Sequence, residues 1–94
     1  MKQKIELPTV FHTVNVIQIN DSGIRVIRSF ADTPEGNKQA RKFFCHMIRK
    51  YEKNHNLIPS DKRELKGYIE EGFYDIYEFN GIKQEYKLLL IHSD

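Results

Sequence analysis

The chain has 94 residues, of which 39% are hydrophobic and 30% charged, and its formal net charge is +2. This length predicts one domain over residues 1–94, and the apolar fraction excludes an intrinsically disordered chain. Its single cysteine, Cys45, excludes an internal disulfide and a cysteine-cluster zinc site. The sequence contains no apolar run long enough to span a membrane and no apolar block of a signal peptide. We therefore expect a soluble, cytoplasmic protein.

The first part of the chain predicts a β-hairpin. Residues 9–19 are rich in β-branched side chains, which favour a strand. Residues 20–23, with the sequence Asn-Asp-Ser-Gly, tolerate positive φ and predict a chain reversal. Residues 24–30 form the expected second strand. Strict alternation along it predicts one face made of Ile24, Val26, Arg28 and Phe30.

A long amphipathic helix follows. Thr33 is a good capping residue, Pro34 suits the first helical position, and Glu35 favours the positive end of the helix dipole. We expect the helix to fray at residues 54–56 and to end before Pro59. Apolar side chains recur at helical spacing and predict a single buried stripe: Ala40, Phe43, Phe44, Met47, Ile48 and Tyr51.

The last third of the chain predicts a second hairpin. Residues 60–66 have the composition of one short helical turn, and residues 68–71 that of a short strand or bulge. Residues 73–79 and 82–91 read as strands around Asn-Gly at residues 80–81, a strong hairpin signal. A two-residue loop would place Glu78 opposite Lys83 and Phe79 opposite Ile82. The same register would pair Phe73 with Leu88.

These elements predict an α+β domain of order β-β-α-β-β, in which a four-stranded antiparallel sheet packs against one long helix. Both sides of the strands are apolar, as where Val14 and Val16 alternate with Ile17 and Ile19. One helix covers only one side of a sheet, so we expect something to cover the other. The candidates are residues 57–65 or 5–8 of the same chain, a second copy packed on the sheet or on its edge, and a small apolar ligand.

The charges are unevenly distributed. Residues 1–63 carry twelve basic and six acidic side chains, whereas residues 64–94 carry three and seven. The face of the helix opposite its apolar stripe carries Lys38, Lys42, Arg49 and Lys53. Such a face is ordinarily solvated, but it also suits the phosphates of a nucleic acid or the acidic hairpin of a second copy.

Aromatic residues are concentrated in the second hairpin, where most are expected to pack in the sheet. Tyr68 and Tyr74 are the two that we expect to be exposed, as binding residues for a protein or nucleic acid. No catalytic or metal-binding arrangement is visible, and no cofactor is expected. Cys45 and His46 diverge by about 100° on a helix, and the four histidines lack the spacing of a metal site.

We therefore expect a small non-catalytic interaction protein that binds proteins and forms a homodimer, similar in size and composition to accessory proteins of bacteria and phages. The alternative is nucleic-acid binding along the basic face of the helix, with an affinity that falls steeply with salt. An enzymatic role is a third hypothesis, and it requires the fold to bring a histidine beside a carboxylate in a pocket.

Overall fold

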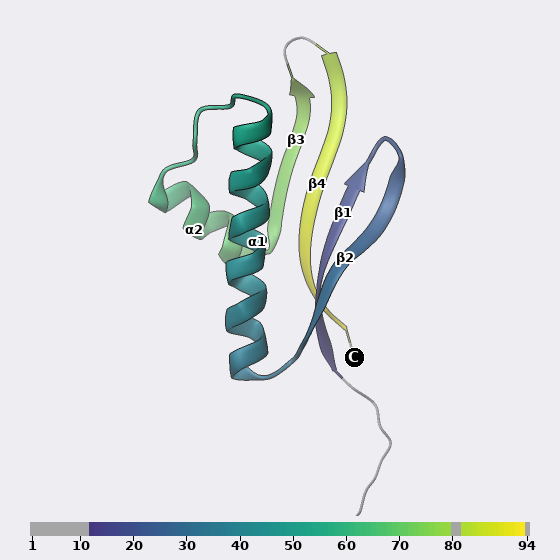
Figure 1. The fold of residues 1–94 in the computed structure, drawn as a ribbon, viewed down its shortest axis with the longest axis vertical. Helices are drawn as coiled ribbons and strands as arrows, with labels where there is room; N and C mark the ends of the chain where they lie inside the picture. Colours follow the sequence, from purple (N-terminus) through teal and green to yellow (C-terminus); the bar gives the residue numbers. More distant parts are fainter. Residues whose placement is uncertain (1–11, 80–81, 94) are drawn as a thin grey trace, which may run out of the picture.

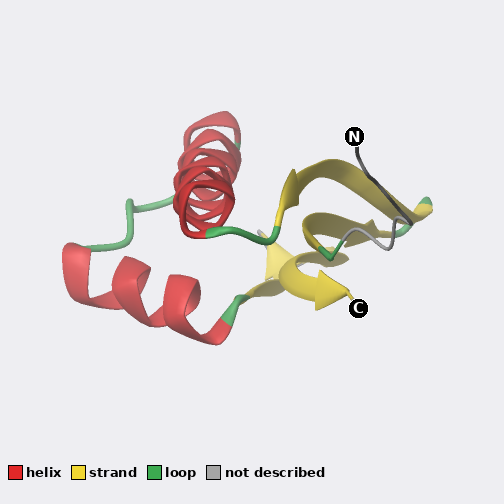
Figure 2. Ribbon diagram, turned by 90° about the horizontal axis from the view of Figure 1, so that it is seen from below, coloured by secondary structure: helices red, strands yellow, loops and turns green. Residues whose placement is uncertain are grey.

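The computed structural model describes residues 12–79 and 82–93, and within them it confirms the α+β class and the antiparallel sheet. Both helices lie on the same side of the sheet, which leaves two layers (Figures 1 and 2). The elements are β1 (Thr13–Asn20), β2 (Gly23–Ala31), α1 (Pro34–Asn54), α2 (Lys62–Glu71), β3 (Phe73–Phe79) and β4 (Ile82–Ser93).

The strand order is β2-β1-β4-β3, and all neighbouring strands are antiparallel. The two hairpins therefore join through β1 and β4, which lie in the centre, while β2 and β3 form the edges. Residues 9–11 of the predicted first strand lie outside the described residues. The central pairing of the first strand with the last joins the two hairpins in one sheet.

The predicted long helix is confirmed, with its start and end where the sequence indicates. Pro34 is its first residue, and the Thr33 hydroxyl accepts a hydrogen bond of 3.0 Å from the Gly36 amide. The predicted apolar stripe faces the sheet: Phe44 and Ile48 are fully buried against Val16 and Leu88. Packing of α1 on the sheet thus makes the core.

The helical turn predicted at residues 60–66 is the start of a longer helix, α2, whereas the short strand or bulge predicted at residues 68–71 is wrong, because these residues continue that helix. Asp61 caps it through the amide of Glu64, and the Glu64 carboxylate accepts from the amide of Asp61. Gly72 ends the helix in the left-handed region at φ 67°. These end signals outweigh the low helix propensity of Gly67 in its interior. Packing of Leu65 and Ile69 against the core holds α2 in place.

The predicted alternation along β2 is wrong because β2 contains a β-bulge. Val16 pairs with Arg28, whereas the next residue of β1, Ile17, pairs with Val26, so Ile27 is an extra residue. The bulge reverses which side chains face the helices. Phe30 packs against the core, whereas Ile24 and Val26 are 75% and 54% exposed.

A second irregularity shifts the register of β3 against β4. Glu78 pairs with Lys83 and Phe79 with Ile82, as predicted for a two-residue loop, although residues 80–81 themselves lie outside the described residues. Beyond Ile76 the register moves by one residue, so the predicted partner of Phe73 is wrong: Phe73 pairs with Leu89. Its side chain therefore lies on the side of the sheet away from the helices, 39% exposed.

Candidate interaction surfaces

The side of the sheet away from α1 and α2, here called the open face, has no covering element among the described residues (Figure 2). The interpretation that residues 57–65 cover it is wrong, because Leu57 and Leu65 pack against the core on the helix side. The other intrachain candidate, residues 5–8, lies outside the described residues. A second copy of the chain and a small apolar ligand remain hypotheses.

An apolar row crosses the open face over all four strands. Ile17 of β1 pairs with Val26 of β2 on one side and with Leu89 of β4 on the other, and Leu89 pairs with Phe73 of β3. Side chains on the neighbouring rows widen this apolar patch: Ile19, Ile24 and Ile91. The outer members of this patch are exposed and its central ones, Ile17, Ile19 and Leu89, are partly exposed, and an apolar patch of this kind is typical of an interaction surface.

Polar residues border the apolar patch at both ends. At one end the Ser29 hydroxyl donates a 2.6 Å hydrogen bond to the Asn15 side-chain carbonyl. At the other end Lys87 stands opposite Asp75 in the register, and its ammonium lies 3.2 Å from the Glu85 carboxylate. Among the described side chains, this border of the open face therefore carries charges of both signs.

The predicted basic face of α1 is present, but one of its four residues is already engaged. Lys38, Lys42 and Lys53 are exposed, and none forms an ion pair within the described part of the chain. The Arg49 guanidinium, by contrast, lies 3.0 Å from the carboxylate of Glu52. Arg49 therefore serves an internal contact, and the three lysines are the cations that this face presents.

The prediction that Tyr74 is exposed is wrong, and Tyr68 is half-buried. Tyr74 is only 3% exposed because the register shift turns it toward the helices. The two rings meet edge to face, with centroids 5.0 Å apart. Burial, with Glu52 nearby, raises the pKa of Tyr74. The contact between these two rings joins α2 to β3. Both tyrosines therefore serve packing within the chain.

Glu52, in the last turn of α1, is a buried carboxylate at 3% exposure. It accepts hydrogen bonds from the Ser60 amide at 2.9 Å, the Ser60 hydroxyl at 2.6 Å and Arg49. Burial raises the pKa of Glu52, but these hydrogen bonds and the Arg49 charge outweigh burial and leave that pKa below its usual value. Glu52 thus anchors the connection between the helices.

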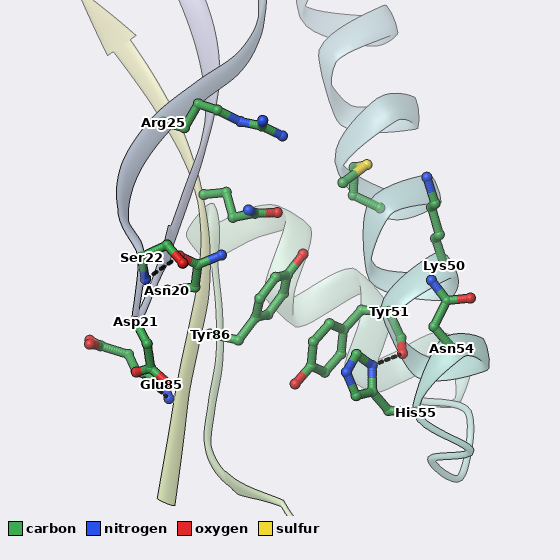
Figure 3. Close-up of a pocket in the computed structure, with 12 residues that line it drawn as sticks. Asn20, Asp21, Ser22, Arg25, Lys50, Tyr51, Asn54, His55, Glu85 and Tyr86 are labelled. Carbon is green, nitrogen blue, oxygen red and sulfur yellow. Dashed lines mark hydrogen bonds between the residues drawn. The ribbon is translucent and has the colours of Figure 1, made fainter.

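A cleft of about 460 Å³ opens between the β1–β2 hairpin and the C-terminal half of α1 (Figure 3). Arg25 reaches into it from β2, and Lys50 lines it from α1. Tyr86 and Tyr51 lie at its floor with their rings stacked, the centroids 3.9 Å apart, and burial raises the pKa of Tyr86 to about 12. This cleft is not predicted from the sequence, although Gln18 and Asn20 break the apolar pattern of β1 there.

The described residues bring no group of three metal-ligating side chains together, and neither described helix is long and apolar enough to cross a bilayer. His92 lies 3.9 Å from the Asp32 carboxylate, with its ring 55% exposed, so this pair lies on the surface. Comparison with protein-family models, curated proteins and solved structures finds no match to the chain.

Proposed function

We propose that this chain is a non-catalytic interaction protein that forms a homodimer by packing the open faces of two sheets together. The observation that carries the proposal is the apolar row of Val26, Ile17, Leu89 and Phe73 across the whole sheet. Leaving such side chains in water forfeits about 1.5–3 kcal/mol for each one that a partner would bury fully. In a domain of this size that is a large fraction of the stability.

The open face suits a second copy of the same chain. In a two-fold dimer each surface meets itself, so a face of one charge sign would repel its own copy. Here the border carries both signs, with Lys87 between Asp75 and Glu85, and the patch between the polar borders carries no charge. Four strands about 4.8 Å apart and about eight residues long outline on the order of 500 Å². A standard interface buries roughly 800 Å² per partner, so the dimer would use the whole open face.

Packing of face on face is favoured over pairing through the edge strands. The bulge at Ile27 distorts the exposed edge of β2, and bulges at sheet edges hinder the addition of another strand. At the other edge β3 is short, with seven residues, and follows directly on α2. The apolar row, in contrast, lies on the flat of the sheet.

Sedimentation velocity over a range of concentrations tests the proposal. We expect the wild type to sediment as a dimer and the variants Ile24→Lys and Val26→Lys as folded monomers, because a charge would be buried in the interface. Ile58→Lys is the matched control, since Ile58 is 92% exposed in the connection between the helices and lies off the open face. A monomeric wild type, or a Val26→Lys variant that still dimerises, would overturn the proposal.

Nucleic-acid binding along α1 is a second candidate. It is supported by Lys38, Lys42 and Lys53, which are exposed without ion pairs in the described part of the chain. The ion pair of Arg49 with Glu52 weakens this candidate, because Arg49 is then less available to a phosphate. Binding of oligonucleotides at low salt that weakens in Lys42→Glu supports this candidate, and the absence of any binding to single- or double-stranded probes rejects it.

A further inference from the structure

The cleft between the β1–β2 hairpin and α1 lies where the core would be expected to continue. On the helix-facing side of β1, Val14 and Val16 are fully buried, but the next two residues on that side are Gln18 and Asn20. Arg25 of β2 pairs with Gln18 and so lies on the same side. The β1–β2 hairpin therefore presents polar groups to the helix at this end instead of apolar side chains.

Within the described part of the chain, the two cations of the cleft form no ion pair, whereas one of its two carboxylates, Glu85, does. Arg25 and Lys50 form no ion pair or side-chain hydrogen bond with the described residues. The Glu85 carboxylate pairs with Lys87 at 3.2 Å, and an Asp21 oxygen accepts a long hydrogen bond of 3.5 Å from the Glu85 amide. Arg25 points across the cleft toward α1, whereas Asp21 and Glu85 lie at its outer edge, away from the helix (Figure 3).

The uncharged polar groups of the cleft also present donors. The side-chain carbonyl of Asn20 accepts a 2.8 Å hydrogen bond from the Ser22 amide, which turns its amino group toward α1 (Figure 3). At the floor, Tyr51 is 6% exposed, and its hydroxyl has no hydrogen-bond partner among the described residues. A buried hydroxyl without a partner costs about 1–3 kcal/mol.

We propose that the cleft binds a small phosphate-bearing molecule, with Arg25 and Lys50 holding the phosphate from the sheet and from the helix. An oxyanion is negatively charged and accepts hydrogen bonds, so it complements these cationic donors. A planar guanidinium binds phosphate through two parallel hydrogen bonds. The volume of about 460 Å³ lies in the range for small organic ligands. The Tyr86 ring and Met47 offer apolar surface to the rest of such a molecule.

A small ligand fits this position better than a nucleic-acid strand. Arg25 points toward the helix across the cleft, not outward along the solvent-facing side of α1 (Figure 3). The site also lies on the helix side of the sheet, opposite the face proposed for dimerisation. Arg25 and Lys50 therefore lie off the open face, although the Glu85–Lys87 pair borders both sites.

Titration of the full chain with 5′-AMP, inorganic phosphate and adenosine, followed by calorimetry and by amide NMR shifts, tests the proposal. We expect AMP to bind with a Kd below about 1 mM, phosphate to compete with it, and adenosine not to bind. The variants Arg25→Gln and Lys50→Gln should each weaken AMP at least about tenfold, since each removes a charged hydrogen-bond donor. The control Lys42→Gln, on α1 but outside the cleft, should bind AMP as the wild type does.

Four results would overturn the proposal: no binding of AMP or phosphate, adenosine binding as tightly as AMP, full affinity in both cleft variants, or an equal loss in Lys42→Gln. An oligonucleotide that binds through Arg25 and Lys50 more tightly than AMP would reassign the cleft to nucleic acid. The Val26→Lys variant separates this site from the dimer, because it should lose the dimer and retain AMP binding.

Discussion

At the scale of single residues, Gly36 decides how closely α1 approaches the sheet. It lies in the first turn of the helix and is buried. A Cβ atom at this position would stand 1.8 Å from the carbonyl oxygen of Ala31, which is backbone at the end of β2. Since that carbonyl belongs to a paired strand, it has little freedom to move away. The glycine is therefore required by packing.

We expect Gly36→Ala to lower the free energy of unfolding by at least about 3 kcal/mol, because the new methyl group overlaps backbone. Gly67→Ala is a matched control in α2, where an added Cβ meets nothing within 4 Å. That substitution should raise stability by about 0.5–1 kcal/mol through helix propensity. Urea unfolding of both variants measures the difference. Equal stabilities would contradict the close approach of α1 to β2.

At the scale of secondary-structure elements, the sequence predicts the elements whose signals are local and misses what depends on pairing. The cap at Thr33 and the apolar stripe of α1 locate that helix almost to the residue. The turn signals place both hairpins. The bulge at Ile27 has no local signature, because it is selected by how β2 fits against β1 and α1. The bulge therefore places other side chains on the open face than strict alternation predicts. The position of Arg25 in the cleft depends on the same pairing of β2 with β1.

The connection between α1 and α2 depends on the buried carboxylate of Glu52. Its pKa is lower in the folded chain than in the unfolded one, so the ionised carboxylate favours the fold. This contribution is complete above the unfolded pKa of about 4.3 and is lost as pH falls through the lower folded pKa. We expect Glu52→Gln to lower stability at neutral pH by about 1–3 kcal/mol and to flatten the acid limb of the stability profile.

Urea unfolding at a series of pH values provides the measurement for Glu52. Glu70→Gln is the control, because Glu70 is exposed on α2 and no hydrogen bond of the described residues involves it. The control should keep both the stability and the acid limb of the wild type. An unchanged profile in Glu52→Gln would mean that the contacts of Ser60 and Arg49 with Glu52 contribute nothing to the fold.

At the scale of the whole molecule, the chain is a two-layer structure whose second sheet side has no layer of its own in the described part. Small domains bury a modest share of their surface, so the loss of one layer weighs heavily on stability. Both helices pack their apolar sides against the same side of the sheet, so α2 does not cover the open face (Figure 2). The stability of the molecule should then depend on the partner that covers the open face.

This dependence predicts that the unfolding midpoint rises with protein concentration. A partner that binds only the folded chain stabilises it by mass action, so a hundredfold change in concentration relative to the dissociation constant is worth about 2.7 kcal/mol. For a domain of this size that corresponds to a shift of several degrees. Thermal unfolding of the wild type at dilute and concentrated protein measures the shift, and Val26→Lys should have the same midpoint at both. A wild-type midpoint independent of concentration would mean that the open face is stable in water, since no second copy would then be contributing to the fold.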